Sequence, residues 1–174
     1  MDRLRIIARA PANIAIVKYM GKTDARLNLP ANASLSMTLD SLCTVVELLD
    51  AGSTHWVALP PQAQISGREL RVPSLDAAGV AKFERHLEFV LEVAPGILRQ
   101  FGIETRMTRG FEIRSANTFP AASGIASSAS AFAALTLAGA AACAGDMAEF
   151  EQVWSARPEF RRAVAQVSRR GAGS

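Results

Sequence analysis

The sequence of 174 residues predicts an α+β domain in which helices pack on one side of a mixed sheet. Two observations carry this prediction. Segments with strand-like alternation fill the first third of the chain, whereas helical spacing begins only near Asp76. Beyond it, one more strand candidate leads through a Gly/Ser-rich loop into an alanine-rich helix and further helices. This order is typical of helices gathered on one face of a sheet.

The expected strands are short apolar or alternating segments bounded by turn residues. They are residues 3–9, 34–39, 44–49, 55–59, 69–72 and 103–113. Ala10-Pro11-Ala12-Asn13 is expected to break the first strand, and the segments 34–39 and 44–49 are expected to form an antiparallel pair.

The expected helices follow the apolar stripes of the second half. The first begins near Asp76 and ends at Pro95-Gly96, because proline and glycine terminate helices. The alanine-rich helix reaches Ala142, a shorter helix spans 146–154, and a last one begins at Pro158. The final residues are expected to form a glycine-rich turn. His55 and His86 are expected to be structural, since His55 lies in a predicted strand and His86 lies beside the apolar stripe of a predicted helix.

Composition limits the function classes. The net charge of +3 is modest and its bases are scattered, which argues against a nucleic-acid-binding face. No apolar run is long enough to cross a bilayer, so no membrane partner is expected. Cys43 and Cys143 are far apart and lack metal-ligand spacing, so both are expected to be small buried hydrophobes in a reduced, cytoplasmic protein.

The segment from Pro120 to Ala134 is the strongest functional signal. Its glycine and serines precede the alanine-rich helix, and the N–H groups at the start of a helix can hold phosphate. The segment alone is also compatible with a helix of small residues that simply packs tightly against a sheet. Phosphate binding and packing therefore both remain open on this stretch.

The distribution of lysine adds a second signal. Of the 19 basic residues only three are lysine, and two of them, Lys18 and Lys22, lie in the pentapeptide Lys18-Tyr19-Met20-Gly21-Lys22. A compact ammonium group suits point-charge contact with phosphate or carboxylate. The alternative is a solvated loop that carries two lysines by chance.

Three segments together resemble one family. Residues 10–22 resemble the first motif of diphosphomevalonate decarboxylases, members of the GHMP kinase superfamily, and residues 29–39 resemble the segment that follows it. Residues 117–135 resemble the ATP-phosphate loop of these enzymes, and residues 170–174 are similar to the start of their Gly-Ser-Gly-Ser substrate turn. The resemblance implies the N-terminal, ATP-binding domain of the family over residues 1–174.

The resemblance implies ATP-dependent decarboxylation of mevalonate 5-diphosphate to isopentenyl diphosphate, a step of isoprenoid biosynthesis, with ATP and Mg²⁺. Lys18 and Ser128 would be the catalytic residues. The implied nucleotide-binding residues are Pro120, Ser123, Gly124, Ala126, Ser127, Ser128 and Ala129. The implied substrate-binding residues are Asn13, Lys18, Tyr19, Lys22 and Ser174. No protein ligand for a metal is implied.

The sequence departs from the family pattern at Met20, where tryptophan is usual, and at Ala172, where a serine is expected. The matching region is expected to stop before the family's substrate-binding arginine and its C-terminal domain with the catalytic aspartate. The chain is therefore expected to be inactive alone and to act as a homodimer or with a complementing chain. Two alternatives remain: a noncatalytic truncated or split binding module, and a GHMP-type kinase acting on a mevalonate-like substrate.

Overall fold

The structure is a computed structural model, and the residues that it describes are 3–18, 20–24, 29–57, 70–72, 75–120 and 127–172.

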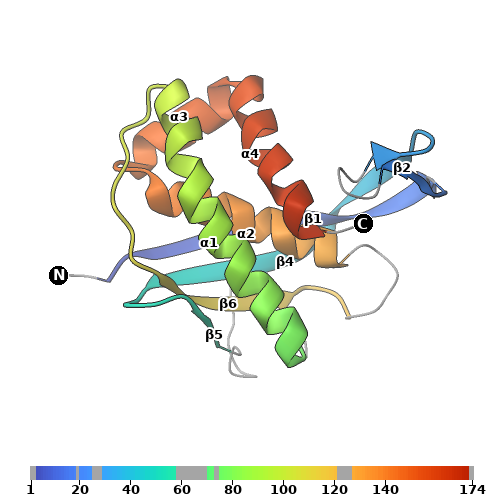
Figure 1. Ribbon diagram of the computed structural model, residues 1–174, viewed down its shortest axis with the longest axis horizontal. Helices are drawn as coiled ribbons and strands as arrows, with labels where there is room; N and C mark the ends of the chain where they lie inside the picture. Colours follow the sequence, from blue (N-terminus) through green and yellow to red (C-terminus); the bar gives the residue numbers. More distant parts are fainter. Residues whose placement is uncertain are drawn as a thin grey trace.

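The main sheet is mixed and has the strand order β1-β4-β6-β5. Its antiparallel part consists of β1 (Arg5–Val17), β4 (Leu35–Asp50) and β6 (Phe111–Asn117), and the short β5 (His55–Trp56) runs parallel to β6. The strands β2 (Lys22–Asp24) and β3 (Leu29–Pro30) form a separate two-stranded sheet. Figure 1 shows the helices on one face of the main sheet, which confirms the predicted fold class.

The first two long strands are continuous where the sequence predicted breaks. Strand β1 passes through Pro11, and β4 joins the two segments that were expected to pair with each other. Pro11 pairs with Cys43 but Ala12 pairs with Leu39, so residues 40–42 have no partner in β1. The two expected breaks are therefore the two sides of one β-bulge. Pro11 is tolerated because β1 is an edge strand.

Helix α1 (Ala77–Gln100) begins where the sequence predicted, with the Asp76 carboxylate accepting a hydrogen bond of 2.7 Å from Gly79 N–H. Its predicted end at Pro95-Gly96 is wrong, because the helix continues to Gln100. Pro95 removes one backbone hydrogen bond. Burial of Ala94 and Leu98 on either side offsets that loss.

The remaining helices confirm most of the predicted pattern. They are α2 (Ser127–Cys143), α3 (Met147–Ala156) and α4 (Pro158–Ala172). Asp146 caps α3 by accepting from Ala148 N–H at 2.7 Å. The expected glycine-rich turn at the end is corrected as far as Ala172, since α4 includes Gly171. Residues 173–174 lie outside the described residues.

Two other strand predictions need correction. The strand expected at 103–113 begins only at Phe111, because Thr105 makes a single bridge to Ala144 instead. Of the segment 69–72, Arg71 bridges Asn117 but forms no strand, and residues 58–69 lie outside the described part of the chain.

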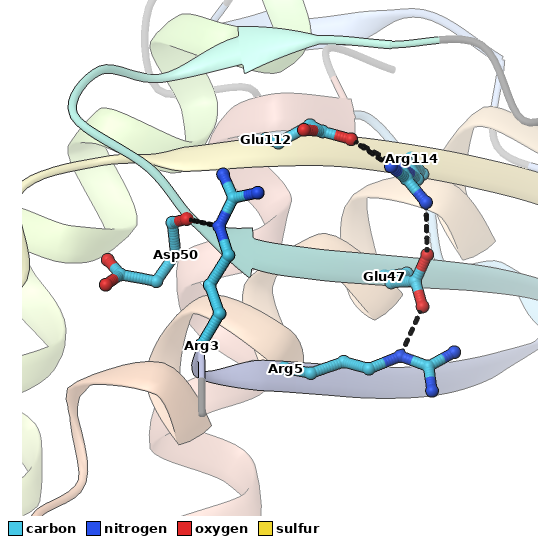
Figure 2. Close-up of polar contacts among 6 residues, drawn as sticks. All are labelled: Arg3, Arg5, Glu47, Asp50, Glu112 and Arg114. Atoms are coloured by element: carbon cyan, nitrogen blue, oxygen red, sulfur yellow. Dashed lines mark hydrogen bonds and ion pairs between the residues drawn. The ribbon is translucent and has the colours of Figure 1, made fainter. Parts of the chain in front are cut away.

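The main core lies between the sheet and the helices. Side chains on one face of the sheet, including Ile6, Val46, Leu48 and Ile113, pack with buried residues of all the helices. On the opposite face, charged side chains form a row across three strands, shown in Figure 2. Glu47 is buried and bonds Arg5 at 2.6 Å on one side and Arg114 at 3.4 Å on the other; Arg114 in turn pairs with Glu112.

Candidate functional site

Helix α2 is the central element of the site. Most of its length is buried because it packs against β1, β4, α1 and α4. Such a helix needs an apolar surface all round, and α2 has one. Exposure returns at its N-terminal end, where Ser128 is exposed, Ala129 is half-buried and Ser130 is buried. The N–H groups that lack intrahelical partners therefore lie at the solvent-accessible end of a buried helix dipole.

The structure describes only part of the predicted phosphate loop. Pro120 is exposed and lies just after Phe119, which is buried. Ser123, Gly124 and Ala126 fall outside the described residues. Ser127, Ser128 and Ala129 form the first turn of α2, which is where a phosphate-binding role requires them.

The lysine pair lies on a projecting hairpin. We call this the arm: residues 13–17 of β1, residues 35–39 of β4, and strands β2 and β3. Lys18 and Lys22 are both exposed on it, and neither ammonium group has a hydrogen bond or ion pair among the described residues. Asn13 is half-buried in β1 opposite Thr38. Tyr19 and Ser174 lie outside the described part.

The turn between the lysines explains the glycine in this motif. Gly21 has φ +85°, a conformation that favours glycine over residues with a Cβ. The turn is held by Asn32, whose side-chain oxygen accepts from Met20 N–H at 2.9 Å, and by Ala31 N–H, which donates to Gly21 O at 3.1 Å. Lys18 and Lys22 are thus fixed on either side of a defined turn. In Figure 1 the arm and the N-terminal end of α2 lie toward the same end of the molecule's long axis.

The face of the arm that continues the core is apolar. Ala12 is buried beneath the helices, and residues two further on share its face, so Ile14 and its partner Met37 extend that face beyond the helices. The exposed apolar residues in this region are Ile14, Ile16, Val17, Met20, Leu29, Leu35 and Met37. Met20, at the position where the sequence departs from the family, is among them.

A basic depression beside α2 is a feature that sequence reasoning missed. Lys82 and Arg85 of α1 line it with Arg170 of α4, around a volume of about 190 Å³. The Lys82 ammonium lies 5.1 Å from the ring centre of Phe132 in α2, and none of the three bases has a carboxylate partner among the described residues. Lys82 is the third lysine of an arginine-rich chain, and this rarity is the sequence signal that could have drawn attention to the depression.

His86 lies in the wall of the same depression, yet it adds no charge at neutral pH. Burial, with the nearby charge of Lys82 as the second cause, lowers the pKa of His86 to about 4. Its Nε2 lies 2.8 Å from the Thr136 hydroxyl. The expectation that His86 is structural agrees with this buried, hydrogen-bonded position.

The described part of the chain was compared with the requirements of a metal site and of a membrane-spanning helix. No group of three or more His, Cys, Asp or Glu side chains there could hold a metal ion. None of the helices there has the length and apolar character needed to span a membrane. Cys43 and Cys143 are buried free thiols, and burial raises the pKa of Cys143 to about 11 although Thr108 and Arg106 oppose it.

Comparison with known proteins places this geometry in a family. The model of the diphosphomevalonate decarboxylase-like N-terminal domain matches residues 10–174. The chain belongs to this family. Among curated relatives, the diphosphomevalonate decarboxylase mvd1 of Aspergillus fumigatus is 33% identical over 98% of this chain. The enzyme of Saccharomyces cerevisiae is 31% identical over 95%.

Solved structures of the family share the fold. A mevalonate diphosphate decarboxylase from Legionella pneumophila superposes with a TM-score of 0.62 at 32% identity, covering 98% of this chain and 48% of that protein. A structure described as MDDEF in complex with MVAPP, AMPPCP and magnesium superposes with a TM-score of 0.57 at 26% identity, covering 99% and 43%. The chain spans 38% of the length of the Aspergillus relative and 37% of the yeast one.

Proposed function

We propose that residues 1–174 form the N-terminal, nucleotide-binding domain of an ATP-dependent decarboxylase that converts mevalonate 5-diphosphate to isopentenyl diphosphate. One observation carries the proposal: the exposed N-terminal end of the buried helix α2 lies toward the same end of a decarboxylase-family fold as the arm with Lys18 and Lys22. The reaction brings together a nucleotide, a diphosphate and a carboxylate, so both anion sites are needed.

The nucleotide phosphates would bind the first turn of α2. Backbone N–H groups from Gly124 to Ala129 would donate to them, with the hydroxyls of Ser123, Ser127 and Ser128, and Ser128 would contact the transferred phosphoryl group. The bases of the depression formed by Lys82, Arg85 and Arg170 would add attraction for a polyanion near the same helix.

The acidic substrate would bind the arm. Lys18, nearest the reacting centre, and Lys22 would neutralise its anionic groups, Asn13 would orient the bound groups, and Tyr19 would line the pocket. Ser174 would contact the substrate phosphate. The exposed Met20 gives this pocket a softer wall than tryptophan would.

Mg²⁺ would arrive with ATP and neutralise phosphate charge. The described residues contain no acidic or His/Cys cluster able to hold it alone, so we assign no protein ligand to the metal.

A homodimer or a complementing chain would cover the apolar arm and supply the catalytic aspartate and the substrate-binding arginine. The buried free thiols of Cys43 and Cys143 suit a cytoplasmic location.

Calorimetry with MgATP tests the nucleotide site. The chain should bind MgATP, and Ser128→Ala should weaken binding by about tenfold to a hundredfold, the usual effect of one lost hydrogen bond to a charged group. Ser155→Ala, a change at an exposed serine of α3, is the matched control and should leave the affinity unchanged. Absence of MgATP binding to the wild-type chain would contradict the proposed function.

An assay of phosphate and CO₂ release, with MgATP and mevalonate 5-diphosphate, tests the reaction. We expect turnover only when the rest of the family fold is supplied, and robust turnover by the chain alone would contradict that expectation. Binding of both ligands without turnover even in the complemented protein would indicate a noncatalytic module. A phosphorylated product that keeps its carboxylate would indicate a kinase.

A further inference from the structure

Three buried polar side chains join the start of α2 to the centre of the sheet. The Thr44 hydroxyl of β4 lies 2.8 Å from the Asn117 side-chain oxygen of β6 and 2.7 Å from the Ser130 hydroxyl of α2. All three residues are buried. No part of the phosphate-binding proposal uses them.

Hydrogen-bonding capacity fixes the direction of this chain of bonds. The Asn117 oxygen can only accept, so the single Thr44 hydroxyl proton is donated to it. Thr44 therefore accepts from the Ser130 hydroxyl, which donates its own proton. With both protons committed, neither hydroxyl can rotate without breaking a buried bond.

At the sheet end of this hydrogen-bond network, the backbone positions of Thr44 and Asn117 are held by their neighbours. Thr44 is paired with Ala10 of β1 on one side and with Asn117 of β6 on the other. Asn117 in turn exchanges two backbone hydrogen bonds with Arg71, of 2.9 and 2.7 Å. The helix end is Ser130, the fourth residue of α2 and two residues after Ser128.

The buried surface of α2 is rich in alanines, which fill space but interlock little with neighbours, although Phe132 and Leu135 are large buried side chains on it. A directional contact adds to what this packing can specify. Fully satisfied buried polar networks specify a single arrangement where small apolar side chains do not. A further side-chain hydrogen bond of α2 joins Thr136 to His86 of α1, further along the helix.

We propose that Thr44 and Asn117 are positioning residues for the nucleotide site. Through Ser130 they set the rotation and axial position of the first turn of α2, and so the placement of its N–H groups and of Ser128. This inference rests on the proposed function, because it assigns the site whose geometry is being held. A shift of a few tenths of an ångström at these donors lengthens every bond to the phosphates.

The variant Thr44→Val keeps the side-chain shape and removes the hydroxyl. We expect it to weaken MgATP binding in calorimetry by about tenfold, equivalent to 1.4 kcal/mol. Thr136→Val is the matched control, since it also deletes a buried, hydrogen-bonded threonine hydroxyl, but away from the first turn. It should lower the melting temperature and keep the affinity within about twofold. Thr44→Ser, which restores the hydroxyl, should recover most of the affinity.

Hydrogen exchange provides a readout that needs no nucleotide. In Thr44→Val the amides of residues 130–133 should exchange faster, while those of residues 139–143 should not; Thr136→Val should not show this local effect. Ser130→Ala, a milder change that leaves the Thr44–Asn117 bond in place, should reproduce both results if Thr44→Val folds poorly.

Two results would overturn the positioning role. One is unchanged exchange at residues 130–133 in both Thr44→Val and Ser130→Ala. The other is a loss of affinity in Thr136→Val equal to that in Thr44→Val, which would reduce the network to general stability. If the wild-type chain binds no MgATP, the proposed function fails, and the positioning of the first turn is still decided by exchange.

Discussion

His86 shows how one side chain is held neutral inside a basic neighbourhood. Its ring packs edge-on to Phe132, 5.0 Å between ring centres, and it lies in the same depression as Lys82, Arg85 and Arg170. Protonation would place a positive charge out of contact with water and, as the smaller effect, near the Lys82 ammonium. The lowered pKa is the consequence.

This lowered pKa predicts a pH-dependent stability. The unfolded chain takes up a proton on this histidine near pH 6.5, whereas the folded chain does so only near pH 4. Stability is therefore retained above pH 6.5, lost as the pH falls toward 4, and constant below that, with a loss of at most about 3 kcal/mol. Urea unfolding of the wild type and of His86→Gln across this range should show a larger loss of stability in the wild type than in the variant. The prediction would be contradicted if the free energy of unfolding of the two proteins changed in parallel with pH.

At the scale of elements, close packing between helices depends on a glycine. Gly171 lies in the last turn of α4, and a Cβ there would fall 2.6 Å from His86 Nδ1 and against the ring of Phe132. Both neighbours are rigid rings packed in the core, so they cannot yield as a flexible chain end could. The approach of α4 to α1 and α2 therefore requires the absence of a side chain.

Two glycine-to-alanine substitutions should change the free energy of unfolding in opposite directions. Gly171→Ala should destabilise the fold by about 1–3 kcal/mol, because the helix must move away from the rings. Gly96→Ala is the matched control, since a Cβ there has no atom within 4 Å, and it should stabilise α1 by about 0.5–1 kcal/mol. Denaturant unfolding measures both. A neutral or stabilising Gly171→Ala would show that α4 can adjust at no cost.

Because the arm exposes apolar side chains, the isolated chain is expected to self-associate. Met37 is 52% exposed on the face that continues the core, whereas Met107 is 100% exposed elsewhere. Contiguous apolar surface of this kind usually marks an interface. The chain should therefore exceed its monomer mass of 18.5 kDa in light scattering at high protein concentration.

The variant Met37→Lys should restore the monomer, because a lysine would have to be buried in the contact. Met107→Lys should leave association unchanged, although it alters a more exposed methionine. A wild-type chain that stays monomeric at high concentration would contradict the proposed role of the arm.

Local signals in the sequence predicted the helices well. Asp146 before α3 and Pro158 at the start of α4 are signals that act within one turn, and both were read correctly. The predicted helix end at Pro95 is wrong because the effect of this proline depends on the burial of Ala94 and Leu98, which is a tertiary property. The bulge between β1 and β4 was misread for the same reason: each strand alone shows a break, and only their pairing shows that the breaks coincide.

The candidate site was predicted in part. Residue types alone pointed to the motif around Lys18 and Lys22 and to a loop that leads from Pro120 into the alanine-rich helix, whereas Ser127, Ser128 and Ala129 were implied by the family resemblance. The network of Thr44, Asn117 and Ser130 and the basic depression were not, because they join residues that are far apart in sequence. Ser123, Gly124, Ala126, Tyr19 and Ser174 stay predictions.

The β-bulge at residues 40–42 affects how this protein can evolve. It separates the part of each long strand that lies in the core from the part that carries the lysines, and Thr118 ties it down by accepting from Cys43 N–H at 2.8 Å and donating to Ser41 O at 3.2 Å. Length changes at this joint would re-aim the arm while leaving the pairing of Ile6, Val46 and Leu48 untouched. The proposed substrate site on the arm could thus diversify without a matching redesign of the interior.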